Sequence, residues 1–160
     1  MKYIAPTLLS VLFLLTACIE GERPREPLAT PAVSIGVWTQ DYDAALKLAA
    51  AKKLPVLLNF TGSDWCGWCK LMDRQVFSLP EWHDYATNNL ILVAIDFPQN
   101  KALVPQEYVP RNEKLSKHYG IQGFPTYILL NAEGQKIGQL GASRDTTPAS
   151  FIAALRRLMD

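Results

Sequence analysis

The segment 55-PVLLNFTGSDWCGWCK-70 decides the fold, because it joins a short apolar run to two cysteines three positions apart. The run from Pro55 to Phe60 has the length and composition of a buried β-strand. Beyond it the apolar residues are spaced by three and four, which predicts an amphipathic helix through Cys69, Met72, Val76 and Phe77. The cysteine pair is therefore predicted at the start of a helix that directly follows a strand.

This position has a chemical consequence for the two cysteines. The free N–H groups and the positive dipole end of a helix favour an anion, so they lower the pKa of a cysteine placed there. Cys66 is the better placed nucleophile. Cys69 lies one turn further on the same face, at a separation that a disulfide can close. We therefore expect Cys69 to expel a partner that is bound to Cys66 as a mixed disulfide.

Two motifs carry a family resemblance. Trp65-Cys66-Gly67-Trp68-Cys69-Lys70, with Gly123-Phe124-Pro125-Thr126 further along the chain, resembles the active-site motifs of thioredoxin-like proteins. The resemblance covers the chain from about Val37 to Asp160. It implies an α/β thioredoxin fold, with a central mixed sheet of four to five strands flanked by helices. It also implies a thiol–disulfide oxidoreductase that needs no cofactor beyond its own Cys66–Cys69 disulfide.

The remaining pattern predicts the other elements of this fold. Capping and closing signals are Thr39 or Asp41, a Ser78-x-x-Glu81 capping box, Gly120, and Thr146 or Thr147. A longer connection than in a minimal thioredoxin lies between Asp96 and Arg111. Expected strands are 35–38, 55–60, 90–97 and 135–140, and residues 121–131 lead into a further strand. Expected helices are 42–53, 69–77, 78–88, 111–119 and one starting at 146 or 147.

The resemblance also assigns roles around the dithiol. Pro125 is expected as a cis proline against the cysteines, which leaves the backbone of Phe124 to pair with an extended substrate; alternatively, Pro125 simply starts an edge strand. Trp68 is expected to present an apolar face to partner proteins, and with Gly67 to help set the reduction potential. Trp65 either packs the turn or acts directly.

Two positions depart from the thioredoxin pattern. That pattern has a buried aspartate near Asn59 and a lysine near Leu92, and both positions are neutral here. If the alignment holds, the proton of Cys69 must pass to solvent, to a substrate group or to another acid such as Asp64.

Composition excludes other classes of function. The 160 residues are 49% hydrophobic and 19% charged with a net charge of +1, which fits one globular domain and gives no support for nucleic-acid binding. His83 and His118 match no zinc-ligand spacing and fall on separate predicted helices, so no metal is expected.

The start of the chain predicts export. Residues 1–17 combine a short positive start with an apolar core too short to span a membrane, which is typical of a signal peptide. Leu15-Thr16-Ala17-Cys18 resembles the lipobox of bacterial lipoproteins, so Cys18 is expected to carry a lipid; an ordinary cleaved signal and an uncleaved anchor are the alternatives. Residues 18–34 would form a tether and 35–160 the thioredoxin-like domain. Ile19 after the cysteine favours the outer membrane.

These features together predict an exported, membrane-anchored thiol–disulfide oxidoreductase on the periplasmic side of a bacterial cell envelope. Its partners would be cysteine-containing envelope proteins and an envelope electron donor. A reductase or isomerase is favoured, because the chain lacks a large inserted helical domain. The alternatives are a thiol reductant in cytochrome c maturation and a redox-inactive module that binds peptides at Phe124 and Pro125.

Overall fold

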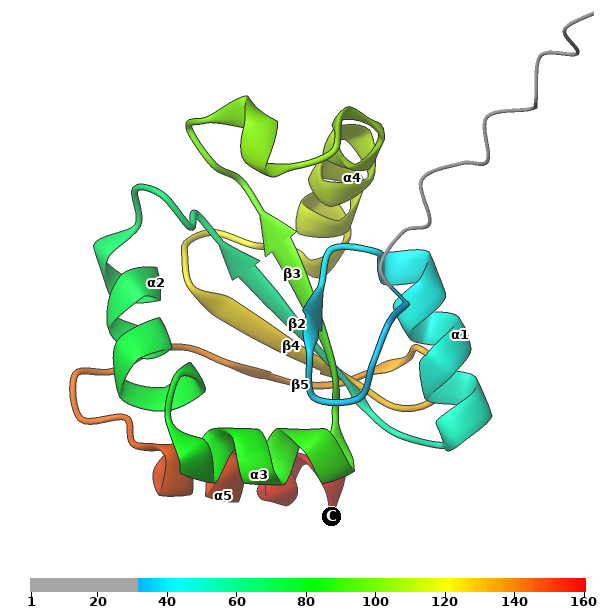
Figure 1. Cartoon of the computed structure of the whole chain (residues 1–160), viewed down its shortest axis with the longest axis vertical. Helices are drawn as coiled ribbons and strands as arrows, with labels where there is room; N and C mark the ends of the chain where they lie inside the picture. Colours follow the sequence, from blue (N-terminus) through cyan, green and yellow to red (C-terminus); the bar gives the residue numbers. More distant parts are fainter. Residues whose placement is uncertain (1–31) are drawn as a thin grey trace, which may run out of the picture. The chain divides into compact units, whose positions relative to one another are not determined.

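The computed structural model describes residues 32–160. These residues form a five-stranded sheet with helices on both faces (Figure 1). The strand order is β1-β3-β2-β4-β5. The first three strands are parallel, and β4 and β5 are antiparallel to their neighbours. The strands are β1 Trp38–Thr39, β2 Val56–Thr61, β3 Ile91–Asp96, β4 Thr126–Leu130 and β5 Lys136–Leu140. The mixed sheet flanked by helices confirms the predicted architecture.

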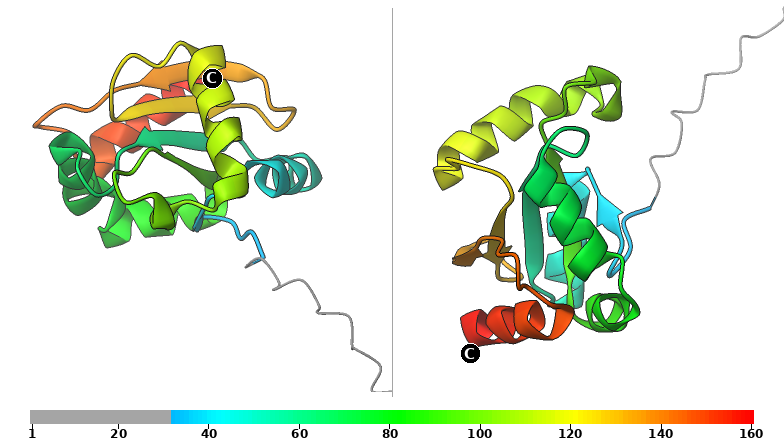
Figure 2. Two further views of the ribbon diagram at one scale, coloured as in Figure 1. Left: turned by 90° about the horizontal axis from the view of Figure 1, so that it is seen from above. Right: turned by 90° about the vertical axis from the view of Figure 1, so that its left-hand side faces the viewer.

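The helices lie in two groups, one on each face of the sheet (Figure 2). One face is covered by α1 and α4, and the other by α2 with its continuation η1, by α3 and by α5. Their bounds are α1 Tyr42–Lys52, α2 Gly67–Met72, η1 Asp73–Phe77, α3 Pro80–Asn89, η2 Lys101–Leu103, η3 Gln106–Tyr108, α4 Val109–Tyr119 and α5 Pro148–Met159. None of the helices in this part of the chain is long and apolar enough to cross a membrane.

Alternate residues of the central strands enter two separate cores. Leu57 of β2 faces α2, α3 and α5, whereas its neighbour Leu58 faces α1 and α4. Both are fully buried, as β-strand alternation in a sheet covered on both faces requires. The first core centres on Phe77, whose ring makes edge contacts with Trp38, Trp82, Tyr127 and Phe151 at centroid distances of 5.4, 5.0, 5.5 and 5.6 Å.

The first strand is shorter and later than predicted. It spans Trp38–Thr39 instead of residues 35–38, because the chain turns at Gly36 before it joins the sheet. Gly36 has a φ of 71°, and an added Cβ would lie 2.5 Å from the backbone of Thr87 in α3. Its N–H donates to the carbonyl of Leu90. This close approach replaces strand pairing at these positions.

Three of the predicted helix-end residues are confirmed, among them Gly120, which ends α4 in the left-handed conformation, and one predicted cap is wrong. Asp41 caps α1 by accepting the N–H of Ala44, and Thr147 caps α5. The Ser78-x-x-Glu81 capping box does not form. The N–H of Ser78 donates to the carbonyl of Asp73, so Ser78 closes the preceding turn, and α3 starts after Leu79 without a side-chain cap.

The helix after the cysteine pair changes its winding. It is α-helical over Gly67–Met72 and π-helical over Asp73–Phe77. The predicted inner face is nevertheless confirmed, because Cys69, Met72, Val76 and Phe77 are all buried. π-turns inside helices occur frequently at functional sites.

Candidate active site

The turn after β2 places Cys66 at the N-terminus of α2. The N–H of Cys66 donates to the carbonyl of Gly62, and Cys66 then acts as the N-cap residue with extended backbone angles. Its sulfur accepts a hydrogen bond from the N–H of Cys69 at 3.1 Å. The cysteine pair therefore opens the helix, as predicted from the change in apolar spacing.

The two cysteines form a disulfide. Their Cα atoms are 5.2 Å apart, within the range that a disulfide closes. Cys66 is 5% exposed and Cys69 is 7% exposed. The exposed fraction therefore does not distinguish the two cysteines, and the difference between them rests on their positions relative to the helix end.

Three aromatic residues contact one another at the turn that precedes Cys66, and we call Trp65, Phe97 and Phe124 the aromatic rim. The indole N–H of Trp65 donates to the carbonyl of Phe97 at 2.9 Å. The ring of Phe124 makes an edge contact with Trp65, at 5.9 Å between centroids, and stacks on Phe97 at 5.3 Å. Gly62 permits this arrangement, because a Cβ there would lie 2.4 Å from the indole. Phe97 had no sequence signal, since only folding brings it to the turn.

The second predicted motif meets the first through this rim. The Phe124–Pro125 peptide bond is cis, as expected from the resemblance. Pro125 is buried and Phe124 is half-buried. Thr126 then starts β4, which pairs with β2 directly before the cysteine turn. The contact between Trp65 and Phe124 therefore brings together two motifs that are far apart in the sequence.

Gly67 and Trp68 lie between the cysteines on the outer side of α2. Trp68 is 43% exposed, and its contact with partner proteins stays a prediction. A Cβ added to Gly67 would meet open space. Neither residue fills the core, so both are accessible beside the two cysteines.

Asp64 is hydrogen-bonded to the connection that follows β3. Its two carboxylate oxygens accept the N–H groups of Gln99 and Asn100, at 3.0 and 2.8 Å. The N–H of Asn100, followed by that of Gln99, lowers the pKa of this carboxyl below 3.8. A carboxylate with both oxygens occupied is a weak base, so Asp64 fits an anchoring role better than the role of proton acceptor.

A cleft of about 400 Å³ lies beside Cys69. Asn59, near which the thioredoxin pattern is expected to have a buried aspartate, lines it, and the Oδ1 atom of Asn59 has no hydrogen-bond partner among the described residues. Two carboxylates, Asp73 and Asp96, also line the cleft. Asp96 accepts hydrogen bonds from the backbone N–H and the hydroxyl of Ser63. The sequence did not indicate that these acids share a cleft with Cys69.

The other candidate residues lie away from this site. His83 is in α3 and His118 is in α4. Residues 32–160 contain no cluster of three histidine, cysteine, aspartate or glutamate side chains that could hold a metal ion. Cys18 and the predicted signal peptide lie outside the residues that the structure describes.

Comparison with known families decides the classification. A profile of the thioredoxin-like domain matches residues 42–158, which include both motifs and all of α5 except its last residue. The chain belongs to the thioredoxin-like family. A solved structure of the oxidoreductase DsbH superposes with a TM-score of 0.71 and 29% identity, covering 87% of this chain and 94% of the other.

Curated relatives support the same classification. Disulfide bond reductase DsbH of Chlamydia pneumoniae is 34% identical over 111 residues, which are 69% of this chain and 66% of the relative. Thiol:disulfide interchange protein DsbD of Klebsiella pneumoniae is 33% identical over 153 residues, which are 91% of this chain and 24% of the relative. The chain thus spans less than two thirds of the length of these relatives.

Proposed function

We propose that the protein is a thiol–disulfide oxidoreductase that exchanges disulfides with cysteines of other proteins. The observation that carries this proposal is the disulfide between Cys66 and Cys69 at the N-terminus of α2, in a turn whose Trp65 contacts Phe124 of the cis Phe124–Pro125 peptide bond. The similarity to a disulfide bond reductase and to thiol:disulfide interchange proteins supports it.

The reaction starts from the dithiol form. The thiolate of Cys66 attacks one sulfur of a client disulfide, forms a mixed disulfide and releases the other client sulfur as a thiolate, which takes a proton. Cys69 then loses its proton, attacks the sulfur of Cys66 and releases the second client thiol. The client gains two electrons and two protons, and the protein is left with the Cys66–Cys69 disulfide. A dithiol protein must return it to the reduced form.

The surroundings of the dithiol support the individual steps. The cleft beside Cys69 gives its proton a route to water along Asp73 and Asp96, which substitutes for the acid absent at Asn59. The backbone of Phe124 pairs with the client chain, and Pro125 shields the sulfurs because it carries no N–H group. Trp65, Gly67 and Trp68 shape the surface on which the client lies.

Electron flow is proposed in the reducing direction, as a reductase or isomerase. The support is the similarity to disulfide bond reductase DsbH. We place the protein in the bacterial cell envelope, on the periplasmic side, after removal of residues 1–17. A lipid on Cys18 holds it at the membrane, with the outer membrane favoured, and residues 18–34 act as the tether. Its clients are cysteine-containing envelope proteins, and its reductant is an envelope dithiol donor.

Reduction of insulin disulfides tests the activity. The chain starting at residue 18 with Cys18→Ser is used, so that lipidation and the third thiol do not interfere. We expect turnover with a dithiol reductant that is lost in Cys66→Ser. No thiol-dependent turnover would favour a redox-inactive peptide-binding module instead. Trapping clients in cells with Cys69→Ser would reveal apocytochromes if the protein serves cytochrome c maturation.

A further inference from the structure

A shallow groove begins at the residues between the two cysteines. It has a volume of about 270 Å³ and is lined by Gly67, Trp68, Leu71, Arg74 and Arg144. We call these five residues the basic groove. Trp68 and Leu71 give it an apolar part, its only charged residues are the two arginines, and both arginines are exposed. The groove shares no residue with the aromatic rim or the cleft beside Cys69. It shares Gly67 and Trp68 with the surface proposed above for the client, but the exchange steps use neither Leu71 nor the two arginines.

The fold holds Arg144 in place although it lies far along the chain. Its guanidinium lies over the ring of Trp68, at 5.5 Å from the centroid. The loop that carries it, between β5 and α5, runs beside α2 (Figure 1). The side chain of Gln75 in η1 donates to the carbonyl of Ser143, and the N–H of Ser143 donates to the hydroxyl of Thr146. The loop is therefore tied both to itself and to the helix of the dithiol.

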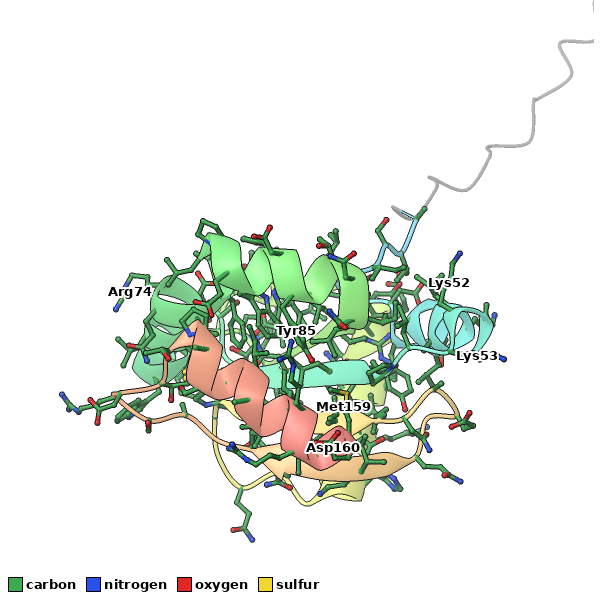
Figure 3. All side chains as sticks on the ribbon, turned by 90° about the horizontal axis from the view of Figure 1, so that it is seen from below. Lys52, Lys53, Arg74, Tyr85, Met159 and Asp160 are labelled. Carbon is green, nitrogen blue, oxygen red and sulfur yellow. A yellow bond between two sulfur atoms is a disulfide. The ribbon has the colours of Figure 1, made fainter. Side chains whose placement is uncertain are left out.

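Arg74 reaches the same groove from the π-helical segment η1. Figure 3 shows its side chain pointing outward from the helix, away from the core. Its neighbour Asp73 instead lines the cleft beside Cys69, so this carboxylate does not line the basic groove. Within residues 32–160 neither Arg74 nor Arg144 donates a side-chain hydrogen bond or forms an ion pair. Both guanidiniums therefore keep their donors available for an incoming group.

We propose that the basic groove selects clients that carry an aspartate or glutamate close to the reactive cysteine. A guanidinium binds a carboxylate through two parallel hydrogen bonds, and Trp68 and Leu71 add apolar contact for a neighbouring side chain. Because the groove starts between the two cysteines, the acidic residue lies within a few positions of the client cysteine in an extended chain. The whole protein carries a net charge of only +1, so the attraction is local to this groove. This inference rests on the proposed function and names its substrate class.

Disulfide-bonded peptides test the proposal. Three versions of one sequence carry aspartate, alanine or lysine beside the cysteine, and kcat/KM is measured for each at low ionic strength. We expect the aspartate peptide to exceed the lysine peptide by about tenfold, since each of two exposed charge pairs contributes a few-fold. The ratio falls with added salt, because exposed charges are screened.

Variants assign the preference to the groove. In Arg74→Ala with Arg144→Ala we expect the ratio to fall to within about twofold of unity, and in Arg74→Glu with Arg144→Glu we expect it to invert. The matched control is Lys47→Ala with Arg157→Ala, which removes two exposed charges on other elements and keeps the full preference. Equal melting temperatures show that the variants are folded. A wild-type ratio near one, or a ratio that survives the double alanine variant, overturns the proposal.

The two proposals fail in different ways. Turnover of all three peptides without a charge preference would support the oxidoreductase activity and overturn the proposed preference for acidic clients. If no peptide is turned over, the proposed oxidoreductase activity is overturned. Binding of fluorescent peptides with serine in place of cysteine then tests, independently of any turnover, whether the basic groove prefers an acidic residue. Tighter binding of the aspartate version, lost in the double alanine variant, supports it, and equal binding of all versions overturns it.

Discussion

The backbone N–H of Cys69 donates a hydrogen bond to the sulfur of Cys66 across 3.1 Å. This bond places the sulfur of Cys66 at the first turn of α2, where the other unpaired N–H groups also favour a negative charge. The two cysteines differ little in exposure, at 5% and 7%. The difference in their chemistry therefore comes from the helix end, which stabilises a thiolate on Cys66 more than one on Cys69.

Single substitutions separate the two roles. We expect Cys66→Ser to lower multiple-turnover disulfide reduction by at least about 100-fold, because it removes the covalent nucleophile. Cys69→Ser keeps the attacking thiolate but cannot resolve the intermediate, so mixed disulfides with the client accumulate. Non-reducing gel electrophoresis in a Cys18→Ser background measures the trapped species. Equal trapping by both variants would contradict the assignment.

Gly36 provides a test of the packing between the first strand and α3. Gly36→Ala should lower the free energy of unfolding by about 3 kcal/mol or more, because a left-handed residue with a Cβ costs about 1–2 kcal/mol and the new atom also displaces backbone. The backbone of Thr87 lies 2.5 Å from the new Cβ. Urea denaturation gives the value.

Gly120 supplies the control for this experiment. It has a φ of 65° but open space around a new Cβ. Gly120→Ala should therefore cost only the conformational part, about 1–2 kcal/mol. Equal losses for the two variants would mean that α3 is not packed against Gly36.

The hydroxyl of Tyr127 is buried without a hydrogen-bond partner among residues 32–160. Tyr127→Phe should therefore leave the free energy of unfolding unchanged or raise it by about 1 kcal/mol, because an unpaired buried polar group is removed. Phe77→Ala in the same cluster should instead cost about 3–5 kcal/mol. A loss above about 1 kcal/mol for Tyr127→Phe would reveal a partner for the hydroxyl.

Tyr127→Phe should also change how the stability of the protein depends on pH in the alkaline range. Burial raises the pKa of Tyr127 above 10.0, so the unfolded chain ionises first as the pH rises. The stabilisation that comes from this difference in pKa between the folded and unfolded states is fully present below pH 10 and is lost progressively as the pH rises above 10. Tyr127→Phe should therefore show a shallower decline of stability above pH 10 than the wild type. Identical declines would contradict the burial of this hydroxyl.

The parts of the site that sequence alone predicted are those encoded locally. The change from an apolar run to a spacing of three and four fixed the cysteines at a helix start, and the resemblance around Phe124 predicted the cis bond of Pro125. The capping box at Ser78 failed although its residue types were correct. A cap requires the chain to enter from an extended conformation, and here Ser78 still belongs to the preceding π-turn.

The parts that sequence did not predict depend on contacts between distant segments. Phe97 meets Trp65 only because the end of β3 runs beside the end of β2, and Arg144 meets Trp68 only because its loop is tied to η1. The spacing of Met72, Val76 and Phe77 fits an α-helix and a π-helix equally well. No local pattern could distinguish these arrangements.

Asp64 connects the active-site turn to the connection after β3, and this link should depend on pH. Its carboxylate accepts the N–H groups of Gln99 and Asn100, and these bonds hold its pKa below 3.8. A carboxyl whose pKa is lower in the folded state stabilises the fold above the unfolded value and loses that effect as the pH falls through the folded value. We therefore expect Asp64→Asn to melt below the wild type at pH 7, and the gap to narrow as the pH falls below 3.8.

Amide hydrogen exchange locates the effect within the chain. In Asp64→Asn the N–H groups of Gln99 and Asn100 should exchange faster at pH 7, because a neutral amide offers one acceptor oxygen in place of two. Asp145→Asn is the control, since it removes an exposed carboxylate from another loop. A melting gap that is constant from pH 7 to pH 3 would show that Asp64 acts through packing and not through its charge. Unchanged exchange at both amides would show that the link does not order the connection between β3 and α4.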